Sequence, residues 1–490
     1  MGTRKRWVAA ALLLAGCVKN PATGERQLAL ITKDQEIAMG QQSKAQVEQT
    51  MPRVDDPQLQ AYVSAVGMKL AKASERPDLP WSFEVVDDPS PNAFALPGGP
   101  IFVTRGLLDY LGSEAELAGV LGHEIGHVTA RHSVEQLSKA ELAEVGLGLG
   151  MVLSERMRSV GQAAGAGLQL LFLKFGRDDE RQADELGFGY MTKHGYAPEA
   201  MARTFQMLEG VSKRAGGGRV PTWASTHPDP GDRAKTAQAR AQKAPAAGKV
   251  EGREAYLARV DGLVFGEDPR QGYMKGETFV HPALDFQLTL PSGWKVQNMP
   301  AALVAVSPKQ DAGLQLSGVG RIAPEEAVQK FLAQEGVKPL GAPAPAAGGA
   351  AAWFQAATKQ GPVAGLVAYV RAGQETLQVV QLTPTELAAA HKAEFERVLG
   401  SYGPITDPAA REVEPARIEV QPLARDMTVE ELAKEPGGTA PPDLLALVNG
   451  VAPGARLQAG QQVKRIVGGM PEAQAGPIAG PAATGTGEGR

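Results

Sequence analysis

The spacing of apolar residues predicts two structurally different parts of the chain. From about residue 33 to 230 the apolar positions mostly recur with a helical period, and only Trp81–Val86 and Pro100–Thr104 have the character of strands. From about Thr278 the pattern changes to short strands separated by turns. The expected elements of this later part are strands at Phe286–Leu290, Leu303–Val306, Leu314–Val319, Ala352–Ala357, Ala364–Val370 and Thr376–Leu382, and helices at Pro324–Glu335 and Pro384–Leu399. The sequence therefore predicts an α-rich domain followed by an α+β domain.

Two helices of the first part have recognisable ends. Ser113 followed by Glu116 forms a capping-box pattern, which predicts a helix that starts at Ser113. A later helix is expected to begin after Asp178 and to end at His194–Gly195, where glycine can adopt the left-handed conformation that closes a helix. Most of the candidate chemical residues discussed below belong to these two helices.

Composition narrows the range of partners and indicates where the linkers lie. Lys and Arg number 50 against 54 for Asp and Glu, a net charge of −4, which leaves no basic footprint for nucleic acid. The chain contains 58 Gly and 36 Pro, an excess expected in linkers and in a tail. The expected organisation is a signal segment at 1–16, a first domain at 17–265, an α+β domain at 272–405, a small unit at 417–467 and a disordered tail at 468–490.

The N-terminus has the pattern of an export signal. Arg4, Lys5 and Arg6 precede a short apolar stretch that ends in Gly16 and Cys17. The stretch is shorter than the roughly 20 residues of a transmembrane helix. Residues 14–17 (LAGC) resemble the bacterial lipobox, and Cys17 is the single cysteine of the chain, so we predict lipidation of Cys17 and anchoring in the cell envelope, on the periplasmic side of the outer membrane. The alternative is an ordinary signal peptide with an accidental cysteine.

A stretch rich in Gly, Ala and Leu, Ala143–Leu173, is open to two interpretations. Charges at Glu155, Arg156 and Arg158 leave no apolar piece long enough to cross a membrane. The stretch is expected to form either a closely packed helical hairpin or a flap that touches a membrane.

The strongest chemical signal is the sequence His123-Glu124-Ile125-Gly126-His127 on the first of the two helices. Four residues of helix advance by roughly 400°, so the two imidazoles lie about 40° apart on one face. Both can then bind one zinc ion, with Glu124 beside the metal as general base. The pattern predicts one Zn²⁺ per chain.

A catalytic zinc needs a third protein ligand, and the residues alone do not identify it. His132 lies about 140° further round a continued helix, which favours a structural role near the helix end. Glu180 and Asp184 are one helical turn apart, so one could bind the metal while the other accepts the free ring N–H of a ligating histidine. Spacing does not separate Glu180 from its acidic neighbours, and a solvated acidic helix start is the alternative.

The motifs in combination resemble the family of zinc endopeptidases that includes the CAAX prenyl endopeptidases and the HtpX-like proteases, in particular its soluble periplasmic, BepA-like lipoprotein branch. The resemblance covers about Val18 to Phe265 and rests on His123–His127, Glu180 with Asp184, Asn92–Ala95, Asn20–Gly24 and Ser225–Pro228. It implies a gluzincin-type domain with a small sheet, in which Glu180 is the third ligand and Asp184 contacts a ligand. It also implies that His227 approaches the metal; the alternative is a turn histidine before Pro228.

The expected activity is that of a metalloendopeptidase. Zinc would lower the pKa of a bound water, Glu124 would take its proton, and the hydroxide would attack the peptide bond. Pro100–Thr104 is expected to be an edge strand to which an extended substrate adds, with Ile101 and Val103 as contacts. The resemblance also places Asn92 beside the substrate. Alternatively, this segment only packs the core through Phe94 and Leu96.

His227 is expected to have one of two opposite roles. A neutral imidazole that binds the metal would occupy the position needed by water and would keep the enzyme latent. An imidazole that stays off the metal would instead donate a hydrogen bond to the developing oxyanion. We favour the first role.

The small unit at 417–467 resembles a LysM module in Asp426–Ala433, Leu447–Gly450 and Ala459–Val463, which implies a βααβ fold and contact with peptidoglycan. It departs from that pattern by the insert Pro436–Pro442, and the alternative is a structural remnant that binds nothing. The function expected for the whole chain is quality control of misfolded or stalled envelope proteins by cleavage. The rival function is a non-proteolytic chaperone or peptidoglycan-tethered adaptor built on the same fold.

Overall fold

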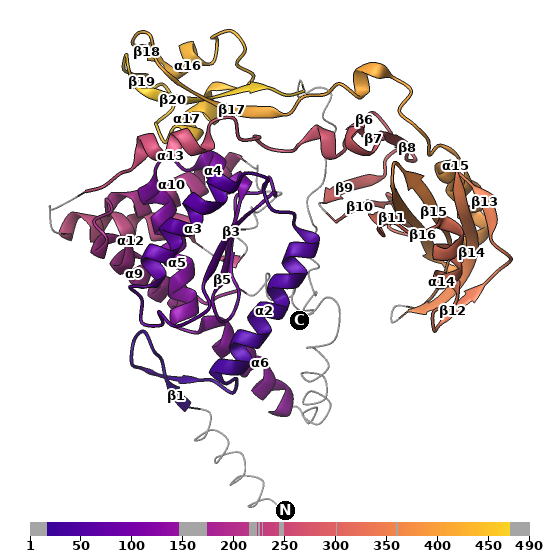
Figure 1. The fold of residues 1–490 in the computed structure, drawn as a ribbon, viewed down its shortest axis with the longest axis horizontal. Coiled ribbons are helices and arrows are strands. Elements are labelled where there is room, and N and C mark those ends of the chain that lie inside the picture. Colours follow the sequence, from indigo (N-terminus) through magenta and orange to yellow (C-terminus); the bar gives the residue numbers. More distant parts are fainter. Residues whose placement is uncertain are drawn as a thin grey trace, which may run out of the picture. The chain divides into compact units, whose positions relative to one another are not determined.

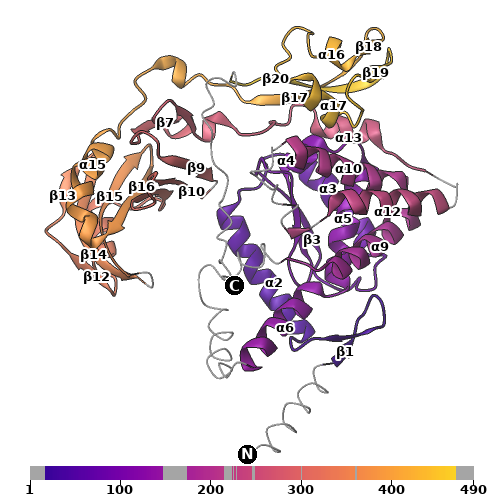
Figure 2. The same ribbon diagram turned by 180° about the vertical axis from the view of Figure 1, so that it is seen from behind.

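The computed structural model describes residues 17–146, 174–214, 223, 226–227, 229–244, 249–299, 301–358 and 361–470. The predicted signal segment, most of the stretch at 143–173 and the predicted tail from residue 471 lie outside these ranges. The described residues form two compact units. One contains the chain up to Gly266 together with Arg417–Val467, and the other contains Glu267–Ala416 and the residues from Gly468 (Figures 1 and 2).

The first unit is α-rich, as predicted, with a small sheet among its helices (Figure 1). The predicted helix after Ser113 is α5, and the predicted helix after Asp178 is α9, which ends at His194 and Gly195 with φ +78° at the glycine. The elements before Arg417 are the helices α2 (Lys33–Thr50), α3 (Pro57–Ala71), α4 (Arg105–Tyr110), α5 (Glu114–Thr129), α6 (His132–Gly146), α9 (Arg177–Lys193), α10 (Glu199–Arg214), α12 (Pro230–Lys243) and α13 (Arg253–Val260), and the strands β1 (Cys17–Lys19), β2 (Arg26–Leu28), β3 (Ser82–Val86), β4 (Ala93–Ala95) and β5 (Pro100–Thr104).

The sheet order corrects one prediction. Its strands run in the order β3-β5-β4, with β5 parallel to β3 and antiparallel to β4. The prediction that Pro100–Thr104 is an edge strand is therefore wrong, because both edges of β5 are paired. The edge strands are β3 and β4, and β4 belongs to the segment that begins at Asn92. Ile101 and Val103 are fully buried in the main core, so they pack the interior and do not face a substrate.

Close packing of α5 on α9 brings the two predicted groups of ligands together. A Cβ on Gly187 would lie 2.6 Å from the backbone N of His123, and a Cβ on Gly122 would lie 2.9 Å from the carbonyl oxygen of Gly187. Only glycine allows backbones to approach this closely. A Cβ on Gly126 would likewise lie 2.9 Å from the carbonyl oxygen of Ala183. The small residues on both helices therefore set the distance between their functional faces.

An N-terminal hairpin lies beside the last turn of α5, where Nδ2 of Asn20 donates to the carbonyl of Ala130 at 3.1 Å. Strand β1 pairs with β2 in antiparallel register, and the turn between them contains the Asn20–Gly24 motif. Ala29 and Ile31, which follow the hairpin, pack against Val134 of α6, and the backbone N–H of Leu30 donates to Oγ of Ser138. The hairpin thus holds the start of α6, the helix that follows α5.

The C-terminal part of the first unit packs directly on the α-rich part. It comprises the strands β17 (Ala416–Pro422), β18 (Met427–Thr428), β19 (Arg456–Leu457) and β20 (Gln462–Gly468), and the helices α16 (Val429–Leu432) and α17 (Pro442–Val448). Lys464 of β20 is fully buried and donates to the carbonyl oxygens of Asp109 and Leu111 at 2.6 and 2.8 Å. Burial lowers the pKa of Lys464 to about 7, since its partners are mainly backbone dipoles.

The second unit has the α+β character predicted for it. Among the described residues its larger sheet has the order β12-β14-β15-β16-β11-β10-β9, with β13 paired to β14. The elements are β6 (Tyr273–Lys275), β7 (Thr278–His281), β8 (Phe286–Thr289), β9 (Lys295–Met299), β10 (Ala302–Val306), β11 (Gly313–Gly318), α14 (Pro324–Leu332), β12 (Val337–Pro339), β13 (Ala344–Ala346), β14 (Gly349–Thr358), β15 (Gly361–Ala372), β16 (Glu375–Pro384) and α15 (Ala388–Gly400).

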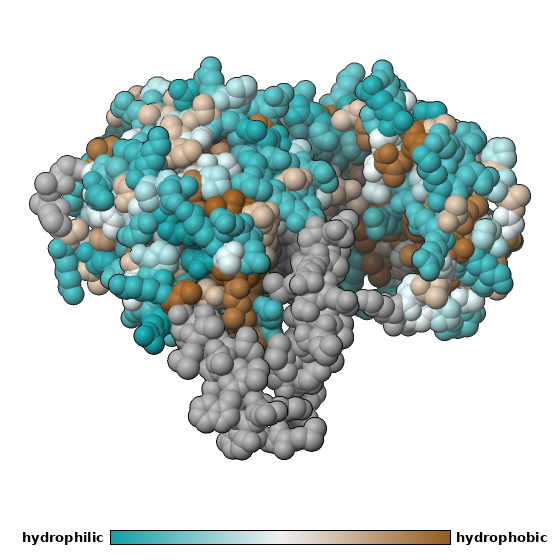
Figure 3. Space-filling view, turned by 60° about the horizontal axis from the view of Figure 1, so that its bottom comes forward, coloured by the Kyte–Doolittle hydropathy of each residue, from teal (hydrophilic) through white to brown (hydrophobic). Residues whose placement is uncertain are grey.

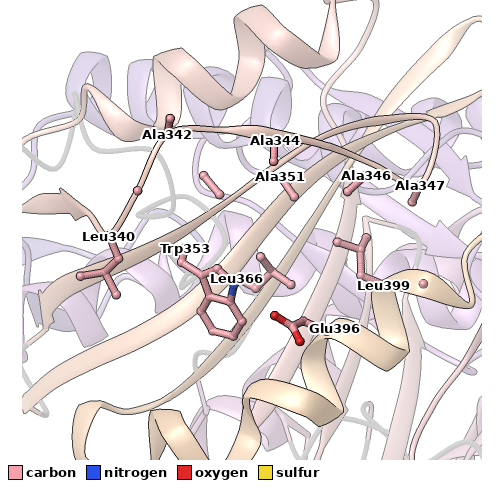
Figure 4. Close-up of a pocket in the computed structure, with 13 residues that line it drawn as sticks. Leu340, Ala342, Ala344, Ala346, Ala347, Ala351, Trp353, Leu366, Glu396 and Leu399 are labelled. Carbon is pink, nitrogen blue, oxygen red and sulfur yellow. The ribbon is translucent and has the colours of Figure 1, made fainter.

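A pocket of about 370 Å³ lies in this second unit, between the sheet and α15 (Figure 4). Its walls are apolar, with Leu340, Trp353, Leu366 and Leu399 among them, and Glu396 is the acidic residue of the lining. None of the candidate catalytic residues contributes to it.

The surface is hydrophilic over most of the face drawn in Figure 3, with scattered apolar side chains. The large apolar residues that the described part of the chain exposes are Val250, Met299, Val319, Leu340 and Leu382. Across that described part, every helix is too short or too polar to span a bilayer.

Candidate metal centre

Helix α5 presents both histidines of the HExxH motif to the same interior space. Its start is fixed as the sequence predicts, because Oγ of Ser113 accepts from the N–H of Glu116 at 3.3 Å. The Glu116 carboxylate accepts a hydrogen bond of 2.6 Å from the backbone N–H of Gly112. In a capping box the donor would be the N–H of Ser113, one residue later. His123, Glu124 and His127 are each at most 3% exposed.

Helix α9 supplies the acidic side of the centre. Glu180 and Asp184, one turn apart, are 2% and 6% exposed and face α5. Oδ1 of Asp184 lies 2.9 Å from Nδ1 of His123, so the carboxylate accepts the ring N–H and leaves Nε2 of His123 free to bind a metal. The solvated acidic helix start that the sequence left open does not describe these two residues, although Asp178 beside them is exposed.

His227 reaches the centre from the segment before α12. Its backbone N–H donates to the carbonyl of Trp223 at 2.8 Å, and its ring stacks on the Trp223 indole, with 5.1 Å between centroids. The imidazole is 2% exposed, and its Nδ1 lies 2.9 Å from Oε1 of Glu180. Of the Ser225–Pro228 motif, only Thr226 and His227 are among the described residues.

The four side chains converge on one point. One ligand atom each from His123, His127, Glu180 and His227 lies within 4.8 Å of all the others. Nε2 of His127 and Nε2 of His123 are 3.0 Å apart, and Nδ1 of His227 is 3.3 Å from Nε2 of His123. Ligands at 2.0–2.1 Å from a tetrahedral zinc lie about 3.3–3.4 Å from one another. The spacing of these atoms therefore fits a metal ion of this size.

The charges of the centre also fit a cation. Glu124, Glu180 and Asp184 are buried with Arg233, so three carboxylates face one guanidinium, and with the histidines neutral the formal charge of this buried site is −2. An uncompensated charge is costly in such a site, and a divalent cation would balance it. In addition, Oε1 of Glu124 is buried without a hydrogen-bond partner in the described structure.

The pKa shifts have clear causes. Burial lowers the pKa of His127 well below its ordinary value, so that its ring is neutral and can act as a ligand. Burial opposes the ionisation of Glu180, but the charges of His227 and Arg233 outweigh this effect and hold the pKa of Glu180 far below its usual range. Burial likewise lowers the pKa of His227, but the Glu180 carboxylate raises it by more. The carboxylate thus attracts positive charge to this point.

Arg233 is the functional residue that the sequence reasoning missed. Its guanidinium from α12 binds Asp184 through two hydrogen bonds of 2.8 and 2.6 Å and forms an ion pair with Oε2 of Glu180 at 2.6 Å. It lies over the rings of Phe205 and Trp223, at 4.3 and 4.8 Å from their centroids. Arg233 therefore orients both carboxylates of α9. No spacing rule connects a lone arginine with acidic residues 49 and 53 positions earlier.

His132 requires a correction. It was expected to point away from His127, on the assumption that the helix continues. Instead α5 ends at Thr129, and Arg131 adopts a left-handed conformation with φ +59° before α6 begins. This turn brings Nδ1 of His132 to 2.9 Å from Nδ1 of His127. His132 is thus a direct partner of a candidate ligand, while it stays outside the group of converging atoms.

The remaining candidate residues lie outside this group. Asn92 is 8% exposed and precedes edge strand β4, with its backbone N–H bound to Oγ1 of Thr104. Phe94 and Leu96 are buried in a small core with Phe102, as the alternative interpretation of this segment supposed. Cys17 begins β1, and its side chain is outside the described part of the structure.

Comparison with known proteins identifies the family. The model of peptidase family M48 matches residues 57–241, a range that includes every converging side chain. Over 244 residues the chain is 31% identical to the mitochondrial metalloendopeptidase OMA1 of Schizosaccharomyces pombe, and the match covers 46% of this chain and 68% of that protein. The chain belongs to peptidase family M48. The family implies a metal, and the four converging side chains fit one, so the predicted enzyme class of metalloendopeptidase is confirmed at the level of the family.

For other relatives, the match covers a smaller share of the relative's own length. The chain is 33% identical over 232 residues to the beta-barrel assembly-enhancing protease of Yersinia pestis, a match that covers 46% of this chain and 47% of that protein. The chain thus spans about half the length of this relative. Among solved structures, cyanobacterial PsbP from Synechocystis matches 27% of this chain and 94% of its own, with 11% identity and a TM-score of 0.23, too low to assign a fold.

Proposed function

We propose that the protein is a zinc-dependent endopeptidase of the bacterial envelope. The observation that carries this proposal is the convergence of His123, His127 and Glu180 beside the buried carboxylate of Glu124, which has a free oxygen. Two imidazoles, a carboxylate and a base next to them are the parts that metal-assisted hydrolysis requires. An adaptor would need the fold and would not need this base.

The side chains divide the work as follows. His123, His127 and Glu180 would hold the zinc, which when bound supplies a Lewis acid for the scissile carbonyl. Glu124 takes the proton of the attacking water and returns it to the leaving nitrogen. Asp184 and Arg233 hold the ligands of α5 and α9 in position through the contacts described above.

The substrate is proposed to bind along β4. In the described sheet this strand pairs with β5 on one side alone, and it contacts α5, which carries the ligands. An extended peptide can add to such an edge through its main chain. Asn92 directly before β4 has a buried Oδ1 without a hydrogen-bond partner in the described structure, which would accept from a substrate N–H. Asn92 thus keeps its proposed role, while Ile101 and Val103 lose theirs.

The decisive experiment is cleavage of an unfolded protein such as casein by the purified soluble chain, with and without a zinc chelator. Cleavage that the chelator abolishes and added zinc restores is expected. A chain that binds zinc but cleaves neither casein nor denatured envelope proteins, both as the wild type and as the His227→Ala variant, would support the rival function, a non-proteolytic chaperone or adaptor.

The location and substrates are part of the same proposal. Several relatives are named as proteases that enhance β-barrel assembly, and the signal-like N-terminus indicates export. We propose misfolded or stalled envelope proteins as substrates, and anchoring of the chain in the outer membrane by lipid on Cys17. Peptidoglycan contact through residues 417–467 is proposed on the LysM resemblance alone.

Replacing Cys17 by Ser should leave the protein without lipid, because the acylated nucleophile is removed. Metabolic labelling with a palmitate analogue measures this directly, and the same cells should show the variant in the soluble periplasmic fraction. A matched Ser43→Ala variant, changed within α2, should label like the wild type. Label that persists on the Cys17→Ser variant would refute the lipobox interpretation.

His227→Ala should raise basal cleavage several-fold. Nδ1 of His227 is 3.3 Å from Nε2 of His123, the distance expected between two ligands of one metal, so with zinc bound the imidazole would occupy the position that water needs. Steady-state kinetics on a quenched peptide measure the effect, with His194→Ala at the end of α9 as the matched histidine control. A fall of kcat by about 10²-fold would instead identify an oxyanion donor. Wild-type kinetics would leave His227 as a turn residue.

A further inference from the structure

A chain of hydrogen-bonded polar side chains, buried except for the partly buried Gln182, connects the candidate ligand His127 with the N-terminal hairpin. It runs from His127 to His132, then to Gln182 of α9, and ends at Asn20 in the β1–β2 turn. His132 and Asn20 are 2% and 5% exposed. Each step in this chain restricts where the next residue can carry its hydrogen.

The restriction at the metal end comes from His127. Its Nε2 faces the converging atoms, at 3.4 Å from Oε1 of Glu180, so this nitrogen must offer a lone pair to bind a metal. A neutral imidazole then carries its hydrogen on Nδ1. The Nδ1 atoms of His127 and His132 are 2.9 Å apart, so Nδ1 of His132 must accept this hydrogen bond.

The tautomer of His132 in turn determines how the amide of Gln182 must be oriented. Once Nδ1 of His132 accepts, its hydrogen lies on Nε2, and Nε2 is 2.9 Å from Oε1 of Gln182. The amide of Gln182 therefore has to present its oxygen and not its nitrogen. If the amide were turned, His132 would carry its hydrogen on Nδ1, and His127 would carry its own on Nε2, where it would block the metal.

Asn20 contacts the amide of Gln182 from the other end. Oδ1 of Asn20 accepts from the backbone N–H groups of Ala22 and Thr23 at 2.9 and 3.3 Å. Because this turn holds Oδ1, Nδ2 of the same amide points inward. Nδ2 donates to Oε1 of Gln27 at 2.7 Å and to the carbonyl of Ala130 at 3.1 Å, and it contacts Oε1 of Gln182 at 3.5 Å. An amide nitrogen at this point favours the oxygen of Gln182 facing it.

We propose that His132, Gln182 and Asn20 are positioning residues that determine which nitrogen of His127 faces the metal. The inference rests on the proposed zinc site and adds a function for the N-terminal hairpin, which begins at the predicted lipid-bearing residue. His123 has its N–H held by the carboxylate of Asp184, whereas His127 has its N–H held by a neutral chain. The two ligands are thus oriented by different kinds of partner, a carboxylate and a neutral side chain.

The direct test is the position of the hydrogens in the wild-type protein loaded with zinc. Long-range ¹H–¹⁵N correlation spectra of histidine labelled with ¹⁵N distinguish the two neutral tautomers. We expect the hydrogen of His132 on Nε2 and that of His127 on Nδ1. A His132 ring with its hydrogen on Nδ1, or with both nitrogens protonated, would overturn the proposal without any mutation.

Zinc affinity, measured by competition with a chromophoric chelator, tests the same chain in variants. His132→Leu removes the acceptor and should weaken zinc binding roughly 10–100-fold, the range known for loss of such outer partners. His132→Asn returns an acceptor oxygen near the place of Nδ1 and should recover most of this loss. Equal affinities of the wild type and the His132→Leu variant would overturn the role of His132.

Asn20→Asp examines the remote end of the chain. Its second carboxylate oxygen would repel Oε1 of Gln182 and turn that amide, so zinc affinity should fall although Asn20 does not touch the metal. The control is Ser138→Ala, which removes the hydrogen bond between Leu30 and α6 and leaves the side-chain hydrogen bonds from Asn20 to His127 unchanged. It should lower the unfolding temperature and keep the wild-type zinc affinity. An Asn20→Asp affinity equal to that of the wild type would remove Asn20 from the proposal.

The outcomes also separate this inference from the proposed function. If the wild-type chain binds no zinc, the metal site itself is wrong and the inference fails with it. If the wild type binds zinc and all variants bind it equally well, the proposed zinc site stands and only the positioning chain is refuted.

Discussion

Glu124→Gln is expected to bind zinc as the wild type does and to lose cleavage by about 10²–10⁴-fold, the usual contribution of a general base. The substitution keeps the size and the burial of the side chain and removes its charge and its ability to take a proton. Glu124 lies outside the group of converging ligand atoms, and Oε1 is 3.8 Å from Nε2 of His227, so the change leaves the ligands in place. Metal analysis after dialysis and cleavage of casein measure the two effects separately.

Glu116→Gln is the matched control for this variant, because it makes the same chemical change on the same helix. The Glu116 carboxylate caps α5 and binds Arg203 at 3.0 Å, away from the centre. Its loss should lower the unfolding temperature and leave cleavage of casein within a few-fold of wild type below that temperature. If Glu124→Gln still cleaved at the wild-type rate, another residue would be the base and the proposed mechanism would fail.

The parts of the centre that could be predicted from the sequence are those encoded locally. His123 and His127 are four residues apart on a helix whose start is set by Ser113, so their common face follows from helix geometry. Glu180 and Asp184 share a face for the same reason. Selection of Glu180 from its acidic neighbours came from the family resemblance and not from the spacing.

The parts that could not be predicted depend on where the chain reverses direction. The left-handed conformation at Arg131 separates α5 from α6 and turns His132 toward His127, whereas a continued helix would have carried it away. Strand β5 was placed at the edge because β4 is only three residues long and rich in alanine, and so gave no strand signal. Arg233 belongs to α12, which reaches the centre only through tertiary packing.

Glu180 and His227 together are expected to decide whether zinc stays bound. Glu180→Ala removes one ligand and one of three carboxylates that balance Arg233 and the cation, so affinity should fall by more than roughly 100-fold, beyond the loss known for outer partners. The structure nevertheless leaves three imidazoles in that variant, and three histidines alone can hold zinc. Some residual binding by Glu180→Ala is therefore expected, and it should depend on His227.

The double variant Glu180→Ala with His227→Ala leaves only His123 and His127, which should not retain zinc through dialysis. Zinc content by mass spectrometry and the rise of the unfolding temperature on addition of zinc both report this loss, because a ligand stabilises the folded state it binds. Glu185 is an exposed residue of α9 that follows Asp184. The Glu185→Ala variant should behave as the wild type in both measurements. Stoichiometric zinc in the double variant would mean that the metal is held by other residues, since two imidazoles on one helix face cannot complete a tetrahedral site.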